Sequence, residues 1–230
     1  MDGDGGSGKG AIERLSDEQR QHAVTMLSTE QFTLQTARSA TIAESGSRAI
    51  LFLGTVSSAV VALAFIGQVS GIGTAFYVFG LVLMPTLFFL GIVTFARVLQ
   101  TGIEDITYAL GTNRIRHFYV ELIPPISPYF ILSAHDDRVG TAENIDFMTS
   151  RWQMFLTTAG MVGVINSVIA GVFAGLLASL PLDRSLAAGV GVGMVVFVLS
   201  AAIHHRLQRM AWDRMGRLAA LFPREPESPH

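Results

Sequence analysis

Three long stretches of this sequence contain no charged side chain, and they constrain the fold more than any other feature. They run over residues 49–96, 152–182 and 185–203, without a single Asp, Glu, Lys or Arg. A helix needs about 20 mostly apolar residues to cross a bilayer. Charged residues make up only 15% of the chain, against about 25% of a typical soluble domain. The sequence therefore predicts a multi-pass, all-α membrane protein and excludes an ordinary soluble domain.

The lengths of these stretches predict four transmembrane helices arranged as two hairpins. Residues 49–96 are too many for one span, and the glycines Gly71 and Gly73 supply a turn between two spans. Residues 152–203 form the second hairpin, because Pro181 and the charged pair that follows it interrupt the apolar run. The fourth span, 185–203, covers about 28 Å at 1.5 Å per residue, which is just enough for the hydrocarbon core.

The positions of the basic residues predict the orientation of these spans. Fifteen of the 16 Lys and Arg residues lie outside the two short turns, five in each of the segments before, between and after the hairpins, and only Arg184 lies in a turn. Positive loops stay in the cytoplasm, so we expect a plasma-membrane protein with both termini cytoplasmic. The chain then divides into a disordered tail over 1–15, a cytoplasmic helix over 16–45, transmembrane hairpins over 49–96 and 152–203, a cytoplasmic segment over 97–151, and a basic amphipathic cytoplasmic tail over 204–230.

The segments outside the spans are predicted to be mainly helical, with one small extended element. Ser16 and Gln19 have the spacing of a capping box that starts the first cytoplasmic helix. After the second span, Gly111 and Asn113 are expected to end a helix. We expect extended structure over the aromatic and branched runs 118–122 and 129–132, which prolines separate, and a short helix over 141–151.

The segment after the fourth span is predicted to be a basic amphipathic helix at the inner leaflet. Its apolar residues share one face and its charged residues another. The apolar set is Leu207, Met210, Ala211, Leu218 and Phe222, and the charged set is Arg206, Arg209, Asp213 and Arg217. Such a helix is expected to bind anionic lipid headgroups. Before it, His204 and His205 are expected to lie at the membrane interface.

Small residues recur at every fourth position of the third span, and a shorter version follows in the fourth. The set is Ala159, Gly163, Ser167, Gly171, Gly175 and Ser179, followed by Gly189 and Gly193. Small ridges allow the close backbone approach that drives helix association in lipid. The sequence therefore predicts a helix-packing face, either within the chain or between chains.

Few polar residues are candidates for a functional site. Asn166 lies in the middle of the third span, where we expect it to hydrogen-bond between helices. His135, Asp136 and Asp137 form the only compact cluster with metal-ligand chemistry, but a metal ion needs three or four convergent ligands. A turn and helix-start role, with Asp137 capping the next helix, is the simpler interpretation. We therefore assign no catalytic, cofactor-binding or metal-binding residue.

Several short runs in the first two thirds of the chain resemble those of a group of bacterial four-span integral membrane proteins to which no activity is assigned. The runs are Leu34–Arg38, Glu44–Arg48, Phe52–Gly54, Arg116–Tyr119 and Leu132–Asp137. The resemblance implies a membrane architecture and carries no functional residue. In layout alone, a cytosolic helix that feeds a two-span hairpin is similar to the membrane effectors of bacterial nucleotide-signalled defence systems.

Composition and motifs leave three functions open. The first is a non-enzymatic, oligomeric scaffold or interaction protein. The second is an effector that permeabilises the membrane in defence or stress, and the third is a membrane enzyme that uses the cluster at His135. The net charge of −2 offers no field for nucleic acid, and the absence of cysteine removes thiol catalysis and disulfides. No cofactor is expected, and the partners expected are lipid and further copies of the chain.

Overall fold

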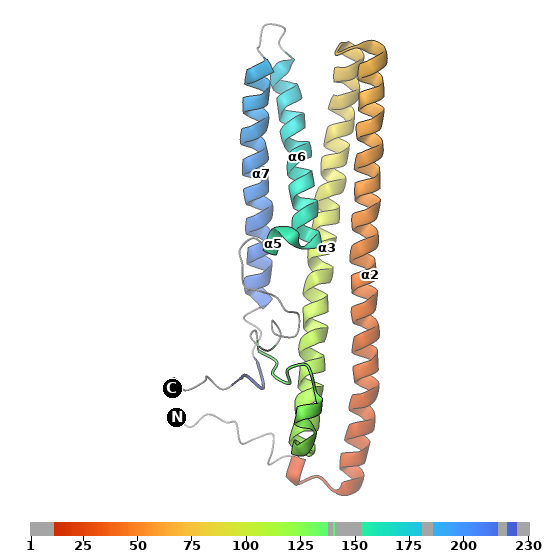
Figure 1. The fold of residues 1–230 in the computed structure, drawn as a ribbon, viewed down its shortest axis with the longest axis vertical. Coiled ribbons are helices and arrows are strands. Elements are labelled where there is room, and N and C mark those ends of the chain that lie inside the picture. The colour runs from red at the N-terminus through yellow and green to blue at the C-terminus, as the bar shows by residue number, and fades with distance from the viewer. Residues whose placement is uncertain (1–11, 138–139, 141–152, 181–185, 216–219, 225–230) are drawn as a thin grey trace, which may run out of the picture. The chain divides into compact units, whose positions relative to one another are not determined.

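The computed structural model describes residues 12–137, 140, 153–180, 186–215 and 220–224. Within these ranges the chain is helical and has no strand (Figure 1). The elements are α2 (Asp17–Ser70), α3 (Thr74–Leu122), the 3-10 helix η1 (Pro124–Tyr129), α5 (Gln153–Leu156), α6 (Thr158–Ser179) and α7 (Leu186–Met215). Four of them, α2, α3, α6 and α7, are long and apolar enough to cross a membrane. The predicted all-α, four-helix membrane architecture is confirmed.

The chain forms two compact units. The membrane unit comprises Ala43–Gly102 and Ser150–Asp213, and it contains all three uncharged stretches. The polar unit comprises Met1–Ile42, Ile103–Thr149 and Arg214–His230. Helices α2 and α3 each contribute residues to both units.

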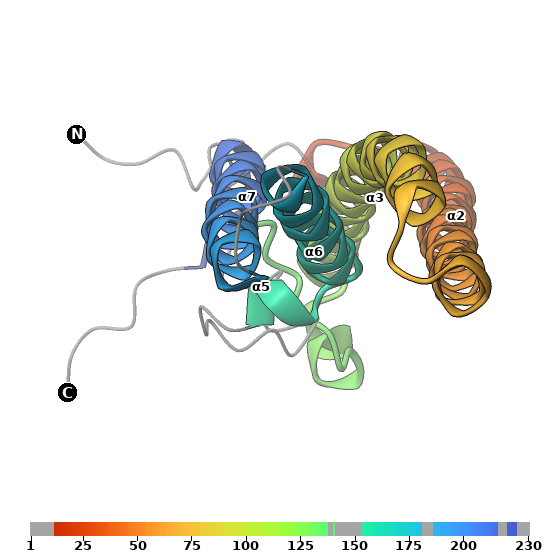
Figure 2. The ribbon, with the colours of Figure 1, turned by 90° about the horizontal axis from the view of Figure 1, so that it is seen from above.

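In the membrane unit, the four long helices lie in the order α2, α3, α6, α7 (Figure 2). Side-chain contacts link each neighbouring pair. A Cβ at Gly80 of α3 would touch Leu176 of α6 at 3.2 Å and Leu63 of α2 at 3.8 Å. The buried core is formed by α2, α3 and α6, with Phe52, Leu87 and Val162 among its most deeply buried residues.

The first helix is longer than expected, since α2 joins the predicted cytoplasmic helix and the first span without a break. Gly46 lies in the middle of it, where an added Cβ would meet nothing within 4 Å, and the helix continues through it. The predicted capping box is confirmed, because Ser16 N–H donates to Gln19 Oε1 at 2.9 Å and Gln19 N–H donates to Ser16 Oγ at 3.2 Å. After α2, Gly71 makes the turn with a φ of +65°.

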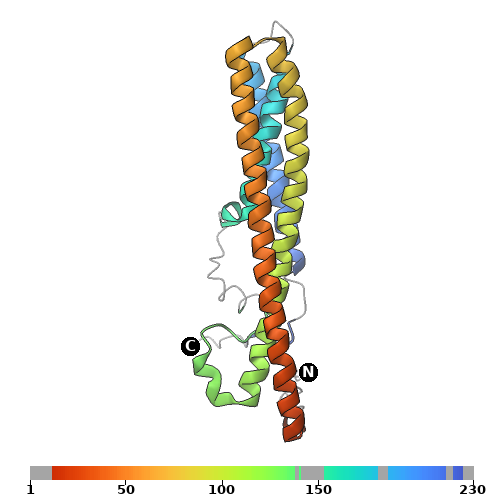
Figure 3. The ribbon, with the colours of Figure 1, turned by 90° about the vertical axis from the view of Figure 1, so that its right-hand side faces the viewer.

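The prediction that a helix ends near Gly111 and Asn113 is wrong, because α3 continues to Leu122. Asn113 is buried and uses its side chain in contacts with other parts of the polar unit, described below, so its weak helix propensity is overridden. The predicted extended run 118–122 is helical, and the chain leaves α3 only before the prolines of η1. Figure 3 shows the segment after η1 folding back beside the end of α3.

The third span begins with a break that the sequence analysis did not predict. The short α5 ends at Leu156, and Thr157 then caps α6 by accepting the N–H of Gly160 at 3.0 Å. Gln208 of α7 binds at the break between α5 and α6. Its Nε2 donates to Thr157 Oγ1 at 2.8 Å and to Met154 O at 3.1 Å. The predicted helix 141–151 and the turn at 181–184 lie outside the described residues.

The expectation that Phe222 lies on an amphipathic helix is wrong. Helix α7 is described as far as Met215, and residues 220–224 are not helical. Phe222 instead contacts the segment around Asp136 in the polar unit. Leu218 lies outside the described residues.

Candidate functional site

A buried polar cluster joins α6 and α7 inside the membrane unit. Asn166 of α6 has an exposed fraction of 0%, and its Nδ2 lies 3.4 Å from Nε2 of His204 on α7. His204 Nδ1 donates to Ser200 O at 2.8 Å, which leaves Nε2 as the acceptor for the Asn166 amide. Ser167 Oγ lies 3.5 Å from the same histidine ring. Asn166 thus has the interhelical position that the sequence suggested.

Two glycines, Gly91 and Gly163, and the ring of Phe95 pack closely around this cluster. A Cβ at Gly91 of α3 would overlap the Asn166 side chain, and a Cβ at Gly163 would lie 3.1 Å from His204 Cβ. The Phe95 ring meets His204 edge-on, with ring centroids 4.7 Å apart. His204, which we expected at the membrane interface, is buried among these helices, with an exposed fraction of 8%. The cluster positions α3, α6 and α7 against one another.

The small-residue ridge of α6 packs within the chain. A Cβ at Gly171 would lie 2.7 Å from Gly193 O, and one at Gly175 would lie 3.1 Å from Gly189 O. These distances show that α6 and α7 approach at backbone contact along this ridge. Towards its start, Ala159 and Gly163 are buried. Ser167 turns its hydroxyl to Gly163 O at 2.7 Å.

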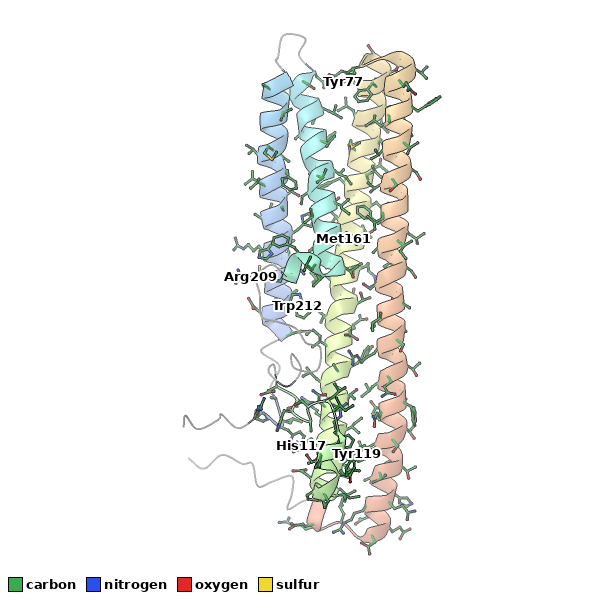
Figure 4. The ribbon with its side chains drawn as sticks, viewed as in Figure 1. Tyr77, His117, Tyr119, Met161, Arg209 and Trp212 are labelled. Carbon is green, nitrogen blue, oxygen red and sulfur yellow. The ribbon has the colours of Figure 1, made fainter. Side chains whose placement is uncertain are left out.

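The end of the ridge nearest the turns meets α3. Ser179 Oγ donates to Leu176 O at 2.9 Å and lies 3.5 Å from the Tyr77 hydroxyl. Tyr77 is labelled at this end of α3 in Figure 4. The ridge therefore makes contacts inside one chain.

In the polar unit, the densest set of polar contacts surrounds Asp136. Its side chain has an exposed fraction of 0%, and one carboxylate oxygen accepts from Arg114 Nε at 2.6 Å. The carboxylate also accepts the backbone N–H of Leu221 at 3.0 Å and of Phe222 at 2.7 Å. Burial alone would raise the pKa of Asp136, but these two N–H groups and the Arg114 cation outweigh it and hold the pKa below its ordinary value.

Two residues of α3 attach the segment before Asp136. Asn113 Nδ2 donates to His135 O at 2.8 Å, and Arg116 Nη1 donates to Ser133 O at 2.6 Å and to Asn113 Oδ1 at 2.9 Å. Burial lowers the pKa of Arg116. The segment is therefore fixed to α3 by buried side chains.

The three cluster residues His135, Asp136 and Asp137 do not converge on one point. Across the described part of the chain, no three His, Asp or Glu side chains are arranged to hold a metal ion. Asp137 Oδ1 accepts the N–H of Gly140 at 2.7 Å, the geometry expected of a helix start, although the residues after Gly140 are not described. The contacts of Asp136 with Leu221 and Phe222 were not predicted, because more than 80 residues separate the partners and no local pattern marks them.

No family model matches the sequence, and no curated protein or solved structure matches it either. The class of the protein therefore rests on its own helices. Four helices of the required length and apolarity define a multi-pass integral membrane protein.

Proposed function

We propose that the protein is a non-catalytic, homo-oligomeric membrane scaffold whose chains pair through one face of α2. The proposal rests on one observation: uncharged residues, most of them small, follow α2 at alternating spacings of four and three, and every one of them is exposed. They are Thr29, Thr33, Thr36, Ala40, Ala43, Ser47, Ile50, Gly54, Ser57, Val61, Ala64 and Gln68. We call this set the α2 seam. Its 3.5-residue period is the one along which two helices pack as a coiled coil.

The α2 seam holds no charge, and the hydroxyls of its first three residues are bonded within the helix. The hydroxyls of Thr29, Thr33 and Thr36 each donate to the carbonyl four residues earlier, at 2.8 to 3.1 Å. Their methyl groups then cover the surface. Beyond Gln31, the charged residues of α2 lie off the seam and are paired, Arg38 with Asp105 at 2.8 Å and Arg48 with Glu44 at 2.8 Å. Two copies of this face can therefore pack against each other without charge repulsion.

Membrane topology determines the direction in which two seams pair. All copies of a chain insert the same way round, so a twofold axis between them lies along the membrane normal and the two α2 helices run parallel. Small residues allow close approach, which drives association in lipid. Phe32, whose side chain is 72% exposed beside the seam, would flank the contact.

Because the chain has no cysteine, single substitutions can test the seam directly. Thr36→Cys places a thiol on the seam, and Gln35→Cys places one on the next residue, which is also exposed but points about 100° away. Oxidation in native membranes should give a disulfide-linked dimer with Thr36→Cys and little with Gln35→Cys. Equal yields from both variants, or none from either, would refute pairing through this face.

We also propose that the polar unit and both termini are cytoplasmic, in the plasma membrane, on the strength of the distribution of basic residues. Cytoplasm-active reporters fused at Gly10, Gly140 and Ser228 should be active. Periplasm-active reporters should be active only at Ile72 or Asp183. A cytoplasmic signal at Asp183 would contradict the arrangement of the last two helices as a hairpin.

Anionic lipids are the second proposed partner, at the end of α7 that follows its apolar stretch. Arg206 and Arg209 are exposed beside the exposed apolar residues Ile203, Leu207 and Met210. Arg209 is labelled on this helix in Figure 4. Cations with an adjacent apolar surface bind anionic headgroups at about 1 kcal/mol per residue near the membrane. Exchanging both arginines for glutamine should weaken retention of phosphatidylglycerol during purification, and unchanged lipid content would contradict the assignment.

The cluster at His135 supports the non-catalytic part of the proposal. Both carboxylates accept backbone N–H groups of this chain, so their chemistry serves folding contacts. His135→Ala should then express and assemble as the wild type does, with no change in metal content. One zinc or manganese per chain that is lost in His135→Ala and in Asp137→Asn would instead favour a membrane enzyme.

A further inference from the structure

The four residues from Leu221 to Arg224, which we call the tail, donate their backbone N–H groups to the carboxylates of two adjacent aspartates. Leu221 and Phe222 donate their backbone N–H groups to Asp136, at 3.0 and 2.7 Å. Proline 223 has no N–H to offer. Arg224 then donates its backbone N–H to Asp137 Oδ2 at 3.1 Å. Each backbone donor that the tail possesses therefore pairs with a carboxylate of the same short segment.

Two further contacts attach the tail in the way that a bound peptide is held. The backbone N–H of Asp136 donates to Phe222 O at 3.3 Å, so the two segments pair in both directions. The Phe222 ring stacks on His117 of α3, with ring centroids 4.0 Å apart and an angle of 19° between the planes. His117 is labelled near the end of α3 in Figure 4. Backbone pairing with one aromatic anchor is a general mode of peptide recognition.

The receiving side is held independently of the tail. Residues 133–137, which we call the strap, are fixed to α3 by Asn113 and Arg116, both buried. The tail contributes much less apolar burial, since Leu221 is 62% exposed and Pro223 and Arg224 are exposed. Its attachment depends on hydrogen bonds to Asp136 and Asp137 and on one ring. An attachment of this kind is reversible without unfolding the strap.

We propose that the strap, with His117, is a peptide-binding site that holds the tail of this chain as a releasable latch and accepts the same sequence offered in trans. The site recognises two consecutive backbone N–H groups, an aromatic side chain on the second of these residues, and the backbone N–H two residues further on. Release of the latch detaches residues 221–224 from the strap. This inference does not depend on pairing through the α2 seam.

Amide exchange on the full-length protein measures whether the latch is held by Asp136. Exchange over residues 220–224 should be at least tenfold faster in Phe222→Ala and in Asp136→Ala than in the wild type. Asp105→Asn breaks a different ion pair of the same unit, with Arg38, and should leave tail exchange unchanged. Equal exchange in the wild type and both latch variants would overturn the proposal. Exchange over residues 103–122 reports in the same experiment whether α3 remains folded.

Binding in trans separates a peptide site from a merely structural contact. Full-length Phe222→Ala has a weakened tail of its own, so a labelled peptide of residues 220–230 should bind it at least tenfold more tightly than it binds the wild type. In the wild type the attached tail competes at an effective concentration of the order of millimolar. A peptide with alanine in place of the phenylalanine, and a chain carrying both Phe222→Ala and Asp136→Ala, should show no saturable binding.

Failure of the wild-type peptide to bind Phe222→Ala would overturn the proposal even if tail exchange had increased. So would equal binding of the two peptides. If Asp136→Ala loses the exchange protection of α3, Asp136→Asn takes its place, because it keeps the volume and one acceptor oxygen while removing the charge. The Phe222→Ala arm decides the outcome in either case, since it changes only the tail.

Discussion

Replacing Gly171 by alanine tests the contact on which the α6–α7 hairpin depends. The added Cβ would lie 2.7 Å from Gly193 O and 3.1 Å from Phe197 Cβ. Ordinary carbon contacts begin near 3.5 Å, so the two helices must separate locally by about 0.5 to 1 Å. Backbone is on the other side of the contact, and no flexible side chain can move aside. Overpacking of this kind costs roughly 1–3 kcal/mol.

Thermal unfolding in mild detergent measures this cost. Each kcal/mol lowers the midpoint of a chain of this size by about 2–4 °C, so Gly171→Ala should melt several degrees below the wild type. Gly193→Ala should behave alike, because its Cβ would lie 2.8 Å from Gly171 O. Gly191→Ala is the matched control on the same helix, where nothing lies within 4 Å, and alanine should be neutral or stabilising there. Equal midpoints for Gly171→Ala and Gly191→Ala would refute the close approach.

Three further outcomes are expected. Protection factors of the Leu221 and Phe222 amides should be constant at neutral pH and fall as pH drops below about 4. The pKa of Asp136 is lowered in the folded protein, so the stability that its carboxylate contributes is present above the pKa of the unfolded chain and is lost as pH falls through the pKa of the folded protein. The Asp136→Asn variant should show no such step. Asn166→Leu should lower the unfolding midpoint by the equivalent of about 0.6–2 kcal/mol, and an unchanged midpoint would show that its contact with His204 contributes nothing. Asp105→Asn, which leaves Arg38 unpaired, should cost only about 0.2–1 kcal/mol, and a larger loss on urea unfolding would contradict its partly exposed setting.

The membrane helices could be predicted from the sequence because hydrocarbon imposes one strict requirement. Every backbone group in a span must be paired within the chain, so a long uncharged run has to be helical. The capping box at Ser16 was predictable for a similar reason, since its two hydrogen bonds join residues only three apart. The ridge at Gly171 was also visible, although its partner helix was not.

The end of α3 was not predictable, because long-range contacts decide it. Asn113 is a poor helix former in isolation, yet its side chain bonds His135 O and Arg116, so the helix passes through it. The break at Thr157 likewise depends on Gln208, which lies 51 residues away. No local signal connects such residues, and the same holds for Asp136 and the tail.

Native mass spectrometry of the wild type from lipid nanodiscs tests the central proposal most directly. We expect an assembly of two or more 24.8 kDa chains. Ala40→Arg, which places a charge on the α2 seam, should shift the protein to single chains, whereas Gln35→Arg beside the seam should leave the assembly intact. A wild type found only as 24.8 kDa single chains would contradict the account, as would an oligomer that Ala40→Arg leaves unchanged.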